Sequence, residues 1–487
     1  MTSSRIGQEP TIQNLIDGAW RESLSEESFS HASPRLETPS AQAPSSNLID
    51  VVQVIQAMNR AQATWIKETK EDRDLRTQKM LAGFLAKVEA HQKELAHELA
   101  LDIGMPLKTG LGRALPGAIE TLKETLKIFE ENLKSPRAPA SGHAAVFLGW
   151  TDPITSFIRR VPMILASGNG VCVKPSSTAP RSVFKISNLL LQALQDSQMP
   201  AGLFAVLFGA GAAAHAKGDE EAVGPALLRH PGLKTIYWLG RTDSALIARE
   251  IAEAHGKRFH YAGSGRNPAI LFQGFEAGAH DVILSNLARA IIDPHGLGPY
   301  RPSRLFIQES VYKPSLEALA SQLSAFKKGD PLSLDTDVGP LPRREIESFQ
   351  KQTKLALSET GHKVVGGETS ENFAEPTLIR DLTNCSTLQS EELAGPWATA
   401  ASFKYQHDAL KYANTSPLGL AGFVIHPDVS KATGVAEKLE ASRVFFSSEV
   451  PWPRAITEPT SPVKQSGNGF DGIRAIFEFG RWQSRYF

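Results

Sequence analysis

Two cysteines are the first candidates for chemistry in this sequence, because a thiolate is both a nucleophile and a metal ligand. Cys172 stands in the apolar run of residues 170–173, which favours a small buried core residue. Cys385, in Thr383-Asn-Cys-Ser-Thr387, has no histidine or basic residue beside it to activate the thiol. The 13 histidines show no paired spacing typical of zinc ligands. A thiol-dependent or metal-dependent reaction therefore has few groups to use, and a substitute nucleophile at Cys385 stays an alternative.

A glycine-broken loop that runs directly into an apolar strand is the next candidate. Residues 293–307 read Asp-Pro-His-Gly-Leu-Gly-Pro-Tyr-Arg-Pro-Ser-Arg-Leu-Phe-Ile. A loop held by a rigid strand is a common place for functional side chains. His295 is a candidate base in this loop. We favour the other interpretation, in which the histidine caps the loop.

A glycine pattern after another apolar run suggests a nucleotide-binding turn. Gly209-x-Gly211-x-x-Ala214 follows residues 203–208 and fits the fingerprint of dinucleotide-binding turns. That fingerprint also needs a strand ending in Asp or Glu about 20 residues further on, and none follows. We favour a tight strand-to-helix turn and keep the dinucleotide site as the alternative.

Helices are predicted ahead of these candidates. Apolar residues recur at three- and four-residue spacing over residues 50–102, and Gly104 and Pro106 end that pattern. A further helix is expected over residues 115–133. The segment 22–47 is rich in Ser, Glu and Pro without a period, so we predict an irregular surface segment there.

Short apolar runs then alternate with helical patterns, which predicts βαβ units and a mostly parallel sheet. A second α/β block is expected over residues 281–441, before a glycine-rich tail at 466–472. An additional short strand and turn at residues 14–20 is indicated by Asp17-Gly18. The predicted strands are residues 145–148, 170–173, 203–208, 235–239 and 269–272.

Length and composition indicate which classes of protein this chain can belong to. At 487 residues the chain suits two or three domains, and 41% hydrophobic with 21% charged residues is ordinary for a globular protein. The 52 basic and 52 acidic residues balance, so we expect no nucleic-acid partner and no anionic membrane surface. The sequence shows no signal peptide and no apolar run of about 18 residues. We therefore expect a cytoplasmic protein.

Several ordered motifs together resemble the aldehyde dehydrogenase superfamily over nearly the whole chain. The resemblance implies an α/β fold with a Rossmann-type nucleotide-binding domain, a second catalytic-type α/β domain and a small bridging β element. These are expected at residues 1–134 and 146–265, at 266–472, and at 135–145 with 473–487. A homodimer or homotetramer is implied as well. The motifs are Asn14-Leu-Ile-Asp-Gly-Ala-Trp20, Gly168-Asn-Gly-Val-Cys-Val-Lys-Pro-Ser176, Thr336-Asp-Val-Gly-Pro-Leu341, Glu391-Glu-Leu-Ala-Gly-Pro396 and Lys464-x-Ser-Gly467.

The resemblance also implies where the catalytic groups should be, and each of those positions is changed. The family's nucleophilic cysteine precedes its strand-opening arginine by five residues, and counting back from Arg304 reaches Pro299. The general base opens a Glu-Leu-Gly-Gly-Lys-x-Pro motif that reads Ala262-Gly-Ser-Gly-Arg-Asn-Pro268 here. The oxyanion-binding asparagine of a Pro-Trp-Asn-x-Pro motif is replaced by Thr151. Proline has neither a thiol nor an amide hydrogen, so it supplies no nucleophile and no oxyanion donor.

The positions that bind the cofactor in the family are closer to its pattern than the catalytic positions are. The resemblance therefore implies NAD or NADP as cofactor. Lys174 is similar to the lysine that contacts the adenosine ribose, and Ser177 replaces the acidic residue that accepts the ribose hydroxyls of NAD. Without that carboxylate a 2′-phosphate is not repelled. Arg241 could pair with phosphate or fill the groove. The full expected set is Trp150, Lys174, Ser177, Gly209, Gly240, Arg241 and Glu392, of which Glu392 resembles the residue that holds the nicotinamide ribose, and no metal ligand is expected.

Three functional hypotheses remain open from the sequence. The leading one is a family member that no longer oxidises aldehydes and is retained for nucleotide or ligand binding or for assembly. The second is an NAD(P)-dependent oxidoreductase that uses displaced groups such as Cys385 or His295. The third is a nucleotide sensor in which only the cofactor pocket works. Asp152 is a candidate acid beside Thr151, although we favour a turn-forming role before Pro153.

Overall fold

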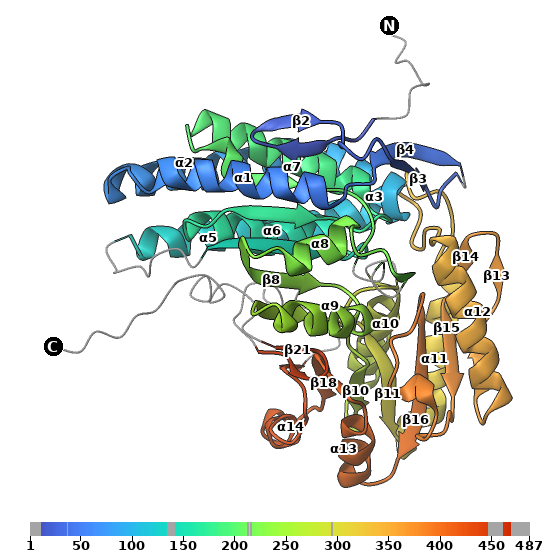
Figure 1. The fold of residues 1–487 in the computed structure, drawn as a ribbon. Helices are drawn as coiled ribbons and strands as arrows, with labels where there is room; N and C mark the ends of the chain where they lie inside the picture. Colours follow the sequence, from blue (N-terminus) through green and yellow to red (C-terminus); the bar gives the residue numbers. More distant parts are fainter. Residues whose placement is uncertain are drawn as a thin grey trace, which may run out of the picture. The chain divides into compact units, whose positions relative to one another are not determined.

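The computed structural model describes residues 11–36, 38–133, 142–211, 214, 217–293, 296–446 and 461–468. The chain forms two compact units (Figure 1). The first unit contains the chain up to Ile103 and Leu115–Tyr261, and the second contains Gly104–Ala114 and the chain from Ala262 to Asp471. The predicted α/β fold is confirmed. Among the described residues, none of the helices has the length and hydropathy of a membrane span.

The first unit is built on a sheet with strand order β2-β1-β7-β6-β5-β8-β9, in which β7, β6, β5 and β8 are parallel. Its strands are β1 (Asn14–Ile16), β2 (Ala19–Arg21), β5 (His143–Leu148), β6 (Val171–Lys174), β7 (Phe204–Val206), β8 (Leu233–Leu239) and β9 (Arg258–Ala262). Its helices are α1 (Leu48–Trp65), α2 (Lys70–Ala90), α3 (Gln92–Ile103), α5 (Leu115–Glu131), α6 (Pro153–Ala166), α7 (Pro180–Asp196), α8 (Val223–Arg229) and α9 (Thr242–Ala254).

Alternation along the strands gives this sheet two buried faces. Ala145 and Phe147 of β5 join the apolar residues of α1, α8 and α9 in one core. On the opposite face Phe157 of α6 packs between Phe84 of α2 and Phe204 of β7, with ring centroids 6.4 and 6.0 Å away. The apolar runs predicted as strands are therefore strands covered by helices on both sides.

One sequence prediction for this unit is wrong. Residues 22–47 contain a hairpin of β3 (Ser28–Ala32) and β4 (Pro39–Pro44) rather than an irregular segment. Its inward residues are small, namely Ala41 and Ala43, so the hydrophobic alternation typical of a strand is weak. The hairpin is instead anchored by a tertiary contact, because the imidazole of His31 lies 3.0 Å from the carboxylate of Asp102.

The second unit has a seven-stranded sheet with the order β12-β15-β16-β11-β10-β18-β19. All neighbouring pairs are parallel except β12 with β15. Its strands are β10 (Asn267–Leu271), β11 (Pro302–Gln308), β12 (His362–Val365), β15 (Thr377–Arg380), β16 (Trp397–Phe403), β18 (Ala421–Ile425) and β19 (Arg443–Phe445). Short pairs are made by β13 (Thr369–Ser370) with β14 (Phe373–Ala374) and by β17 (Leu418–Gly419) with β20 (Val463–Lys464); β21 is Gly467–Asn468.

Helices cover both faces of this sheet as well. Leucines of α10 (Ala277–Ile292) and α11 (Glu309–Ala325) join one core, whereas α13 (Gln406–Asn414) and α14 (Val429–Ala436) line another. The helix α12 (Arg343–Ser358) packs a third cluster against the segment that leads into β16. The short turns α4 (Leu107–Thr109) and Gly110–Ala114 also belong to this unit.

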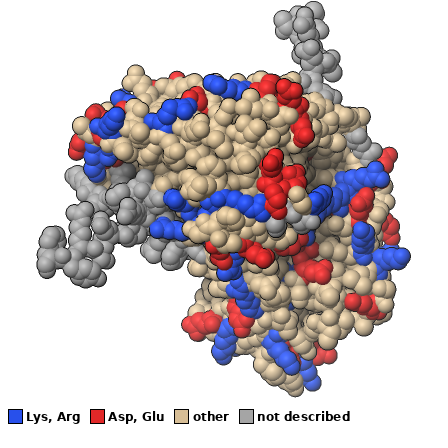
Figure 2. Space-filling model, viewed as in Figure 1, with Lys and Arg blue, Asp and Glu red and all other residues tan. Residues whose placement is uncertain are grey.

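The expected bridging element lies mostly outside the described residues, at 134–141 and 469–487. His143, Ala144 and Ala145, which that prediction included, form the start of β5. The charged residues of both signs are intermingled on the face shown in Figure 2, where the described residues form no continuous basic surface. Nucleic-acid binding and oligomeric state stay predictions.

Candidate functional site

In the first unit, most of the expected cofactor positions meet at one edge of the sheet. Phe147 of β5 pairs with Lys174, the last residue of β6, and Leu148 pairs with Leu239, the last residue of β8. These strands are parallel, so their carboxyl ends lie side by side. Ligands of open α/β sheets bind outside that edge. Trp150 and Thr151 follow β5, and Gly240 and Arg241 follow β8, so the fold brings these positions together around Lys174.

Two glycines let the neighbouring loops of this edge approach closely. A Cβ atom added to Gly149 would lie 2.9 Å from the carbonyl oxygen of Leu239 and 3.2 Å from Cα of Gly240. A Cβ atom added to Gly240 would lie 3.4 Å from Nε1 of Trp238. The backbones after β5 and β8 therefore lie in contact, and a side chain at either glycine would disturb that contact.

Lys174 is the most informative group at this edge. Its side chain is 4% exposed, and its amine has no hydrogen-bond or ion-pair partner among the described residues. Burial lowers the pKa of this amine to about 7. Nζ faces the chain after β7, since a Cβ atom added to Gly211 would lie 3.7 Å from it. A buried amine without a partner is costly, and a ligand that accepts hydrogen bonds or carries negative charge would remove that cost.

Ser177 lies in the turn between β6 and α7 and is exposed. In this turn the amide of Thr178 donates to the hydroxyl of Ser176 at 3.2 Å. Ser177 is uncharged, whereas an acidic residue at this position would carry a negative charge. The position therefore does not repel a phosphate group on the ribose.

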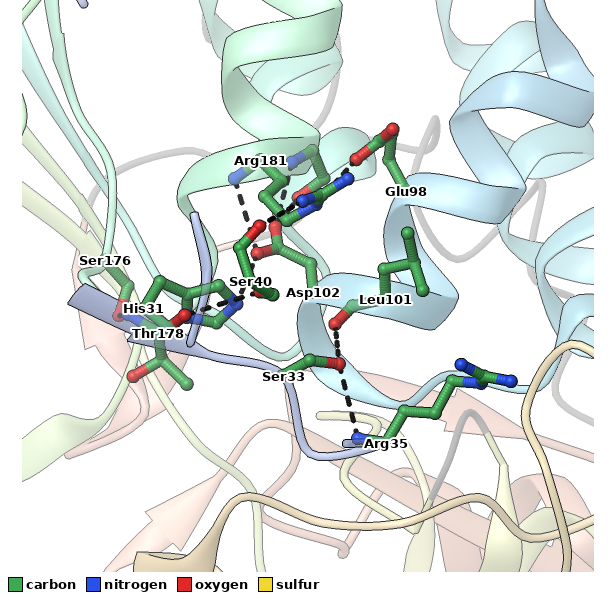
Figure 3. A network of polar contacts seen from close by, with 11 residues as sticks. His31, Ser33, Arg35, Ser40, Glu98, Leu101, Asp102, Ser176, Thr178 and Arg181 are labelled. Atoms are coloured by element: carbon green, nitrogen blue, oxygen red, sulfur yellow. Dashed lines mark hydrogen bonds and ion pairs between the residues drawn. The ribbon is translucent and has the colours of Figure 1, made fainter. Parts of the chain in front are cut away.

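Asp102 anchors the end of that turn, as Figure 3 shows. Its carboxylate, which is fully buried, accepts the backbone amides of Arg181 at 3.3 Å and Ser182 at 2.8 Å. It also accepts the Ser182 hydroxyl at 2.6 Å and lies beside His31. An acceptor for the first amides of a helix is the usual stabiliser of its N-terminus. Here the acceptor comes from α3, 80 residues earlier than Ser182, so sequence reasoning missed it.

The start of α9 carries its own ion pair. The guanidinium of Arg241 donates to the carboxylate of Asp243 at 3.2 to 3.3 Å. Burial alone would raise the pKa of Asp243, but the hydrogen bond and charge of Arg241, together with Ser244, lower it below the ordinary value. The sequence left two alternatives for Arg241, namely pairing with phosphate or filling the groove. In the structure the side chain pairs instead with an acid at the helix N-terminus. A phosphate at this helix would compete with Asp243.

Trp150 and Thr151 are half-buried residues between β5 and α6, and Asp152 occupies the position before the first residue of that helix. Burial raises the pKa of the Asp152 carboxyl, and Thr155 and Arg159 offset part of that effect. One carboxyl oxygen, Oδ1, is buried without a hydrogen bond. Asp152 is therefore harder to ionise than an ordinary aspartate. It lies directly before the helix, at the position where a turn-forming residue was expected.

Gly209 lies after β7 with a φ of +133°, which strongly favours glycine. A Cβ atom added there would lie 3.0 Å from the amide nitrogen of Ser46. After Gly211 the next described α-helix is α8, which begins at Val223. Among the described residues Ala214 and Lys217 are 3-10 helical, and no α-helix starts directly at this turn, as the dinucleotide fingerprint requires.

In the second unit the three remaining positions meet at the amino ends of parallel strands. Ala262 lies before β10, Pro299 before β11, and Glu392 before β16. Asn267 pairs with Pro302, and Arg304 pairs with Thr399, so the segments ahead of these strands are neighbours. The fold therefore gathers the positions expected for the nucleophile, the base and the nicotinamide-ribose carboxylate.

The side chain of Asn267 binds the backbone of the loop at Pro299. Nδ2 of Asn267 donates to the carbonyl oxygens of Pro299 at 2.7 Å and Arg301 at 2.9 Å. Its Oδ1 accepts the amide of Ala421 at 3.1 Å. Asn267 is 1% exposed, so its amide group is satisfied only within the protein. This residue, which sequence reasoning did not single out, anchors the backbone at Pro299 and Arg301.

Two buried arginines stabilise the same region by donating to carbonyl groups. Arg266 binds the carbonyls of Leu388 and Ser303, and Arg304 binds those of Tyr412 and Ala413. Burial lowers the pKa of Arg304 to about 9. Arg304 opens its strand as expected, and its contacts indicate a structural role.

Glu392 is half-buried and already has partners in its own unit. Its carboxylate accepts the hydroxyl of Ser264 at 2.5 Å. Arg301 donates to the carbonyls of Leu393 at 2.9 Å and Trp397 at 2.8 Å. Burial lowers the pKa of Arg301 to about 10, and the charge of Glu392 opposes that decrease. The acid thus serves as an acceptor and a counter-charge within the second unit.

Neither cysteine lies where the nucleophile is expected. Cys172 is fully buried in β6, and burial raises the pKa of its thiol. Cys385 is exposed in the turn after β15. His295 lies outside the described residues. Within the described ranges no group of three or more His, Cys, Asp and Glu side chains could hold a metal ion.

Comparisons with known proteins agree with this architecture. The profile of the aldehyde dehydrogenase family matches residues 20–482. Mitochondrial succinate-semialdehyde dehydrogenase from Arabidopsis thaliana is 27% identical over 485 residues, which are 95% of this chain and 86% of the relative. Cytosolic 10-formyltetrahydrofolate dehydrogenase from Xenopus laevis is 26% identical over 96% of this chain, which spans only 52% of that relative's length.

A solved structure of indole-3-acetaldehyde dehydrogenase in complex with NAD+ is 25% identical and has a TM-score of 0.85. The match covers 96% of this chain and 94% of that one. Fold, motif order and family profile therefore lead to one conclusion: this chain belongs to the aldehyde dehydrogenase family.

Proposed function

We propose that this protein binds an NAD(P)-type nucleotide but does not oxidise aldehydes through the thiol route of its family. The proposal joins two sets of residues. Lys174 and its neighbours in the first unit would hold the adenosine part of the nucleotide. Pro299 and Ala262 in the second unit lack the groups needed for covalent chemistry.

The observation that supports nucleotide binding is the amine of the buried residue Lys174, which has no partner in the part of the chain that the structure describes. Ribose hydroxyls or a phosphate would supply acceptors that the described protein does not. Gly149 and Gly240 allow the backbone after β5 and β8 to approach a ligand. When bound, the nicotinamide of such a nucleotide can accept or donate a hydride. The residues of this edge would bind and orient it.

The absence of thiol chemistry is supported by the Pro299 loop. Proline offers no sulfur and no amide hydrogen, and Asn267 holds its carbonyl in place. Ala262 supplies no base to activate water, and Thr151 replaces the asparagine expected as an oxyanion donor. A thioester intermediate therefore has neither its attacking atom nor its hydrolytic base at these positions.

Ser177 extends the proposal to NADP. An exposed hydroxyl in the turn after β6 neither binds a ribose diol bidentately nor repels a 2′-phosphate. We expect NAD and NADP to bind with similar affinity. A homo-oligomeric state and a cytoplasmic location, which the resemblance and the composition suggest, belong to the same proposal.

An oxidoreductase with an altered site is the second candidate, and the exposed thiol of Cys385 favours it. The relatives in the comparison are named as dehydrogenases. A displaced nucleophile would need a basic partner to form its thiolate. This candidate predicts turnover that is lost in Cys385→Ser.

The test is calorimetry of the full chain with NAD and NADP, together with an assay of nucleotide reduction by a panel of aldehydes. Saturable binding without reduction supports the proposal. Reduction of NAD(P) that requires Cys385 would favour the second candidate. Absence of binding by both nucleotides would contradict the proposal.

A further inference from the structure

The side chain of Lys174 ends an apolar row on the sheet of the first unit. Successive residues of a strand point to opposite faces, so Lys174 shares its face with Cys172. Cys172 belongs to the core that α1, α8 and α9 cover. Phe147, the partner of Lys174 in the register of β5 and β6, belongs to the same core and stacks on Trp238 with ring centroids 5.0 Å apart. The methylene stem of Lys174 therefore continues this apolar row as far as the edge of the sheet.

Space beside the amine lies at the chain that follows β7. A Cβ atom added to Gly211 would lie 3.7 Å from Nζ of Lys174. Outside Gly211 and its two neighbours in the chain, Nζ is the one described atom within 4 Å of that point. The missing side chain at Gly211 thus leaves room next to the amine. Because Lys174 is only 4% exposed, this room admits a small molecule and excludes a large one.

Burial changes the chemistry of this amine. It lowers the pKa of Lys174 to about 7. Roughly half of the amine is then neutral at pH 7, compared with about 0.03% for a lysine with the ordinary pKa of 10.5. Only the neutral form has the lone pair that attacks a carbonyl carbon, and desolvated lysines form Schiff bases for this reason. In the part of the chain that the structure describes, no hydrogen-bond or ion-pair partner competes for this nitrogen.

We propose that the amine of Lys174 captures small aldehydes as imines. Its nitrogen attacks the carbonyl carbon, and the carbonyl oxygen leaves as water with both hydrogens of the neutral amine. No electrons are transferred, so the step needs neither a nucleotide nor a thiol. Water reverses the step and releases the aldehyde. The residues involved, Lys174 and Gly211, belong to the first unit, and the capture does not depend on the proposed binding of a nucleotide.

The test treats the full chain with acetaldehyde and sodium cyanoborohydride at pH 7. The borohydride reduces each imine to a stable ethyl-lysine, and peptide mass spectrometry follows the rate of ethylation at each lysine. We expect Lys174 to be ethylated at least about tenfold faster than the exposed lysines of the same unit, Lys79 and Lys93. The excess of neutral amine is larger than tenfold, but a less basic nitrogen is also a weaker nucleophile.

Two variants and one further lysine locate the reaction. Gly211→Ala places a methyl group 3.7 Å from Nζ, in the space that the aldehyde needs, so the selective ethylation of Lys174 should be lost. Gly83→Ala is its control in the same unit, because the new Cβ atom would lie 3.9 Å from Cβ of Ala193, an ordinary contact. It should leave the ethylation rates as they are. Lys257, whose amine is also buried but donates to two carbonyls, should react more slowly than Lys174.

The outcomes separate this inference from the proposed function. Ethylation of Lys174 that is no faster than that of Lys79 and Lys93 would overturn the inference, whether or not NAD binds. Selective ethylation that Gly211→Ala leaves unchanged would overturn the place assigned to the aldehyde. Selective ethylation in a protein that binds neither NAD nor NADP would support the inference and contradict only the proposed function.

Discussion

Replacement of Lys174 by methionine is the most direct test of the ligand edge in the first unit. The change keeps the length of the side chain and removes the amine. In the folded protein the pKa of Lys174 is lowered by burial to about 7, compared with an ordinary value of 10.5. The unfolded chain therefore binds a proton that the folded chain releases over that pH interval.

The sign of the pH dependence of stability follows from the number of protons that each state binds. Between pH 7 and pH 10.5 the unfolded state holds more protons than the folded state, so the free energy of unfolding rises with pH. The cost of burying Lys174 is thus largest at and below pH 7 and disappears as the pH approaches 10.5. With a pKa of about 7 in the folded state, this amine alone raises the stability by roughly 2 kcal/mol from pH 7 to pH 9.

Lys174→Met has no such amine, so we expect the variant to exceed the wild type in stability by up to roughly 4 kcal/mol at pH 7. The advantage should shrink by about half at pH 9. Urea unfolding of the full chain at pH 7, 8 and 9 measures both quantities. Parallel stability curves for the two proteins would refute the reasoning that the amine is buried without a partner.

The same variant should lose nucleotide affinity, because the amine is the proposed contact for the adenosine ribose or its phosphate. We expect the Kd for NADP to rise at least about tenfold. Lys257→Met is the control, since the Lys257 amine is also buried but binds the carbonyls of His230 and Leu233. Equal NADP affinities in wild type and Lys174→Met would remove Lys174 from the site.

Three further predictions concern the groups that position the candidate residues. Asn267→Ala should cost roughly 3 kcal/mol of stability in urea unfolding, because two loop carbonyls, one of them from Pro299, lose their donor; unchanged stability would contradict the anchoring role. Asp102→Ala should cost roughly 3 to 5 kcal/mol, since the first amides of α7 lose their acceptor and the buried imidazole of His31 loses the carboxylate beside it, and a loss below about 1 kcal/mol would argue against it. Asp243→Asn should tighten NADP binding about threefold by removing a negative charge at the N-terminus of α9, where a phosphate would bind, whereas weaker binding in calorimetry would show that the acid itself helps.

Much of the fold could be predicted because its signals are local. Apolar runs alternate with helical periods, so the strands β5 to β8 and the helices between them follow from the sequence. Positive φ angles of 55° at Asp17 and 74° at Gly18 fit the predicted turn. The motif order correctly identified the family. The hairpin of β3 and β4 escaped prediction, because its small inward residues give no hydrophobic alternation.

The candidate site was only partly predictable. The sequence by itself determined which residue types occupy the expected positions, including Pro299, Ala262 and Lys174, because identity needs no folding. Tertiary structure alone decided which of them have partners. Ser264 meets Glu392 across 128 residues, and no local pattern links two such positions. Lys174 lacks a partner among the described residues for the same physical reason: satisfaction of a buried polar group depends on every segment that packs around it, and those segments are adjacent only in the folded chain.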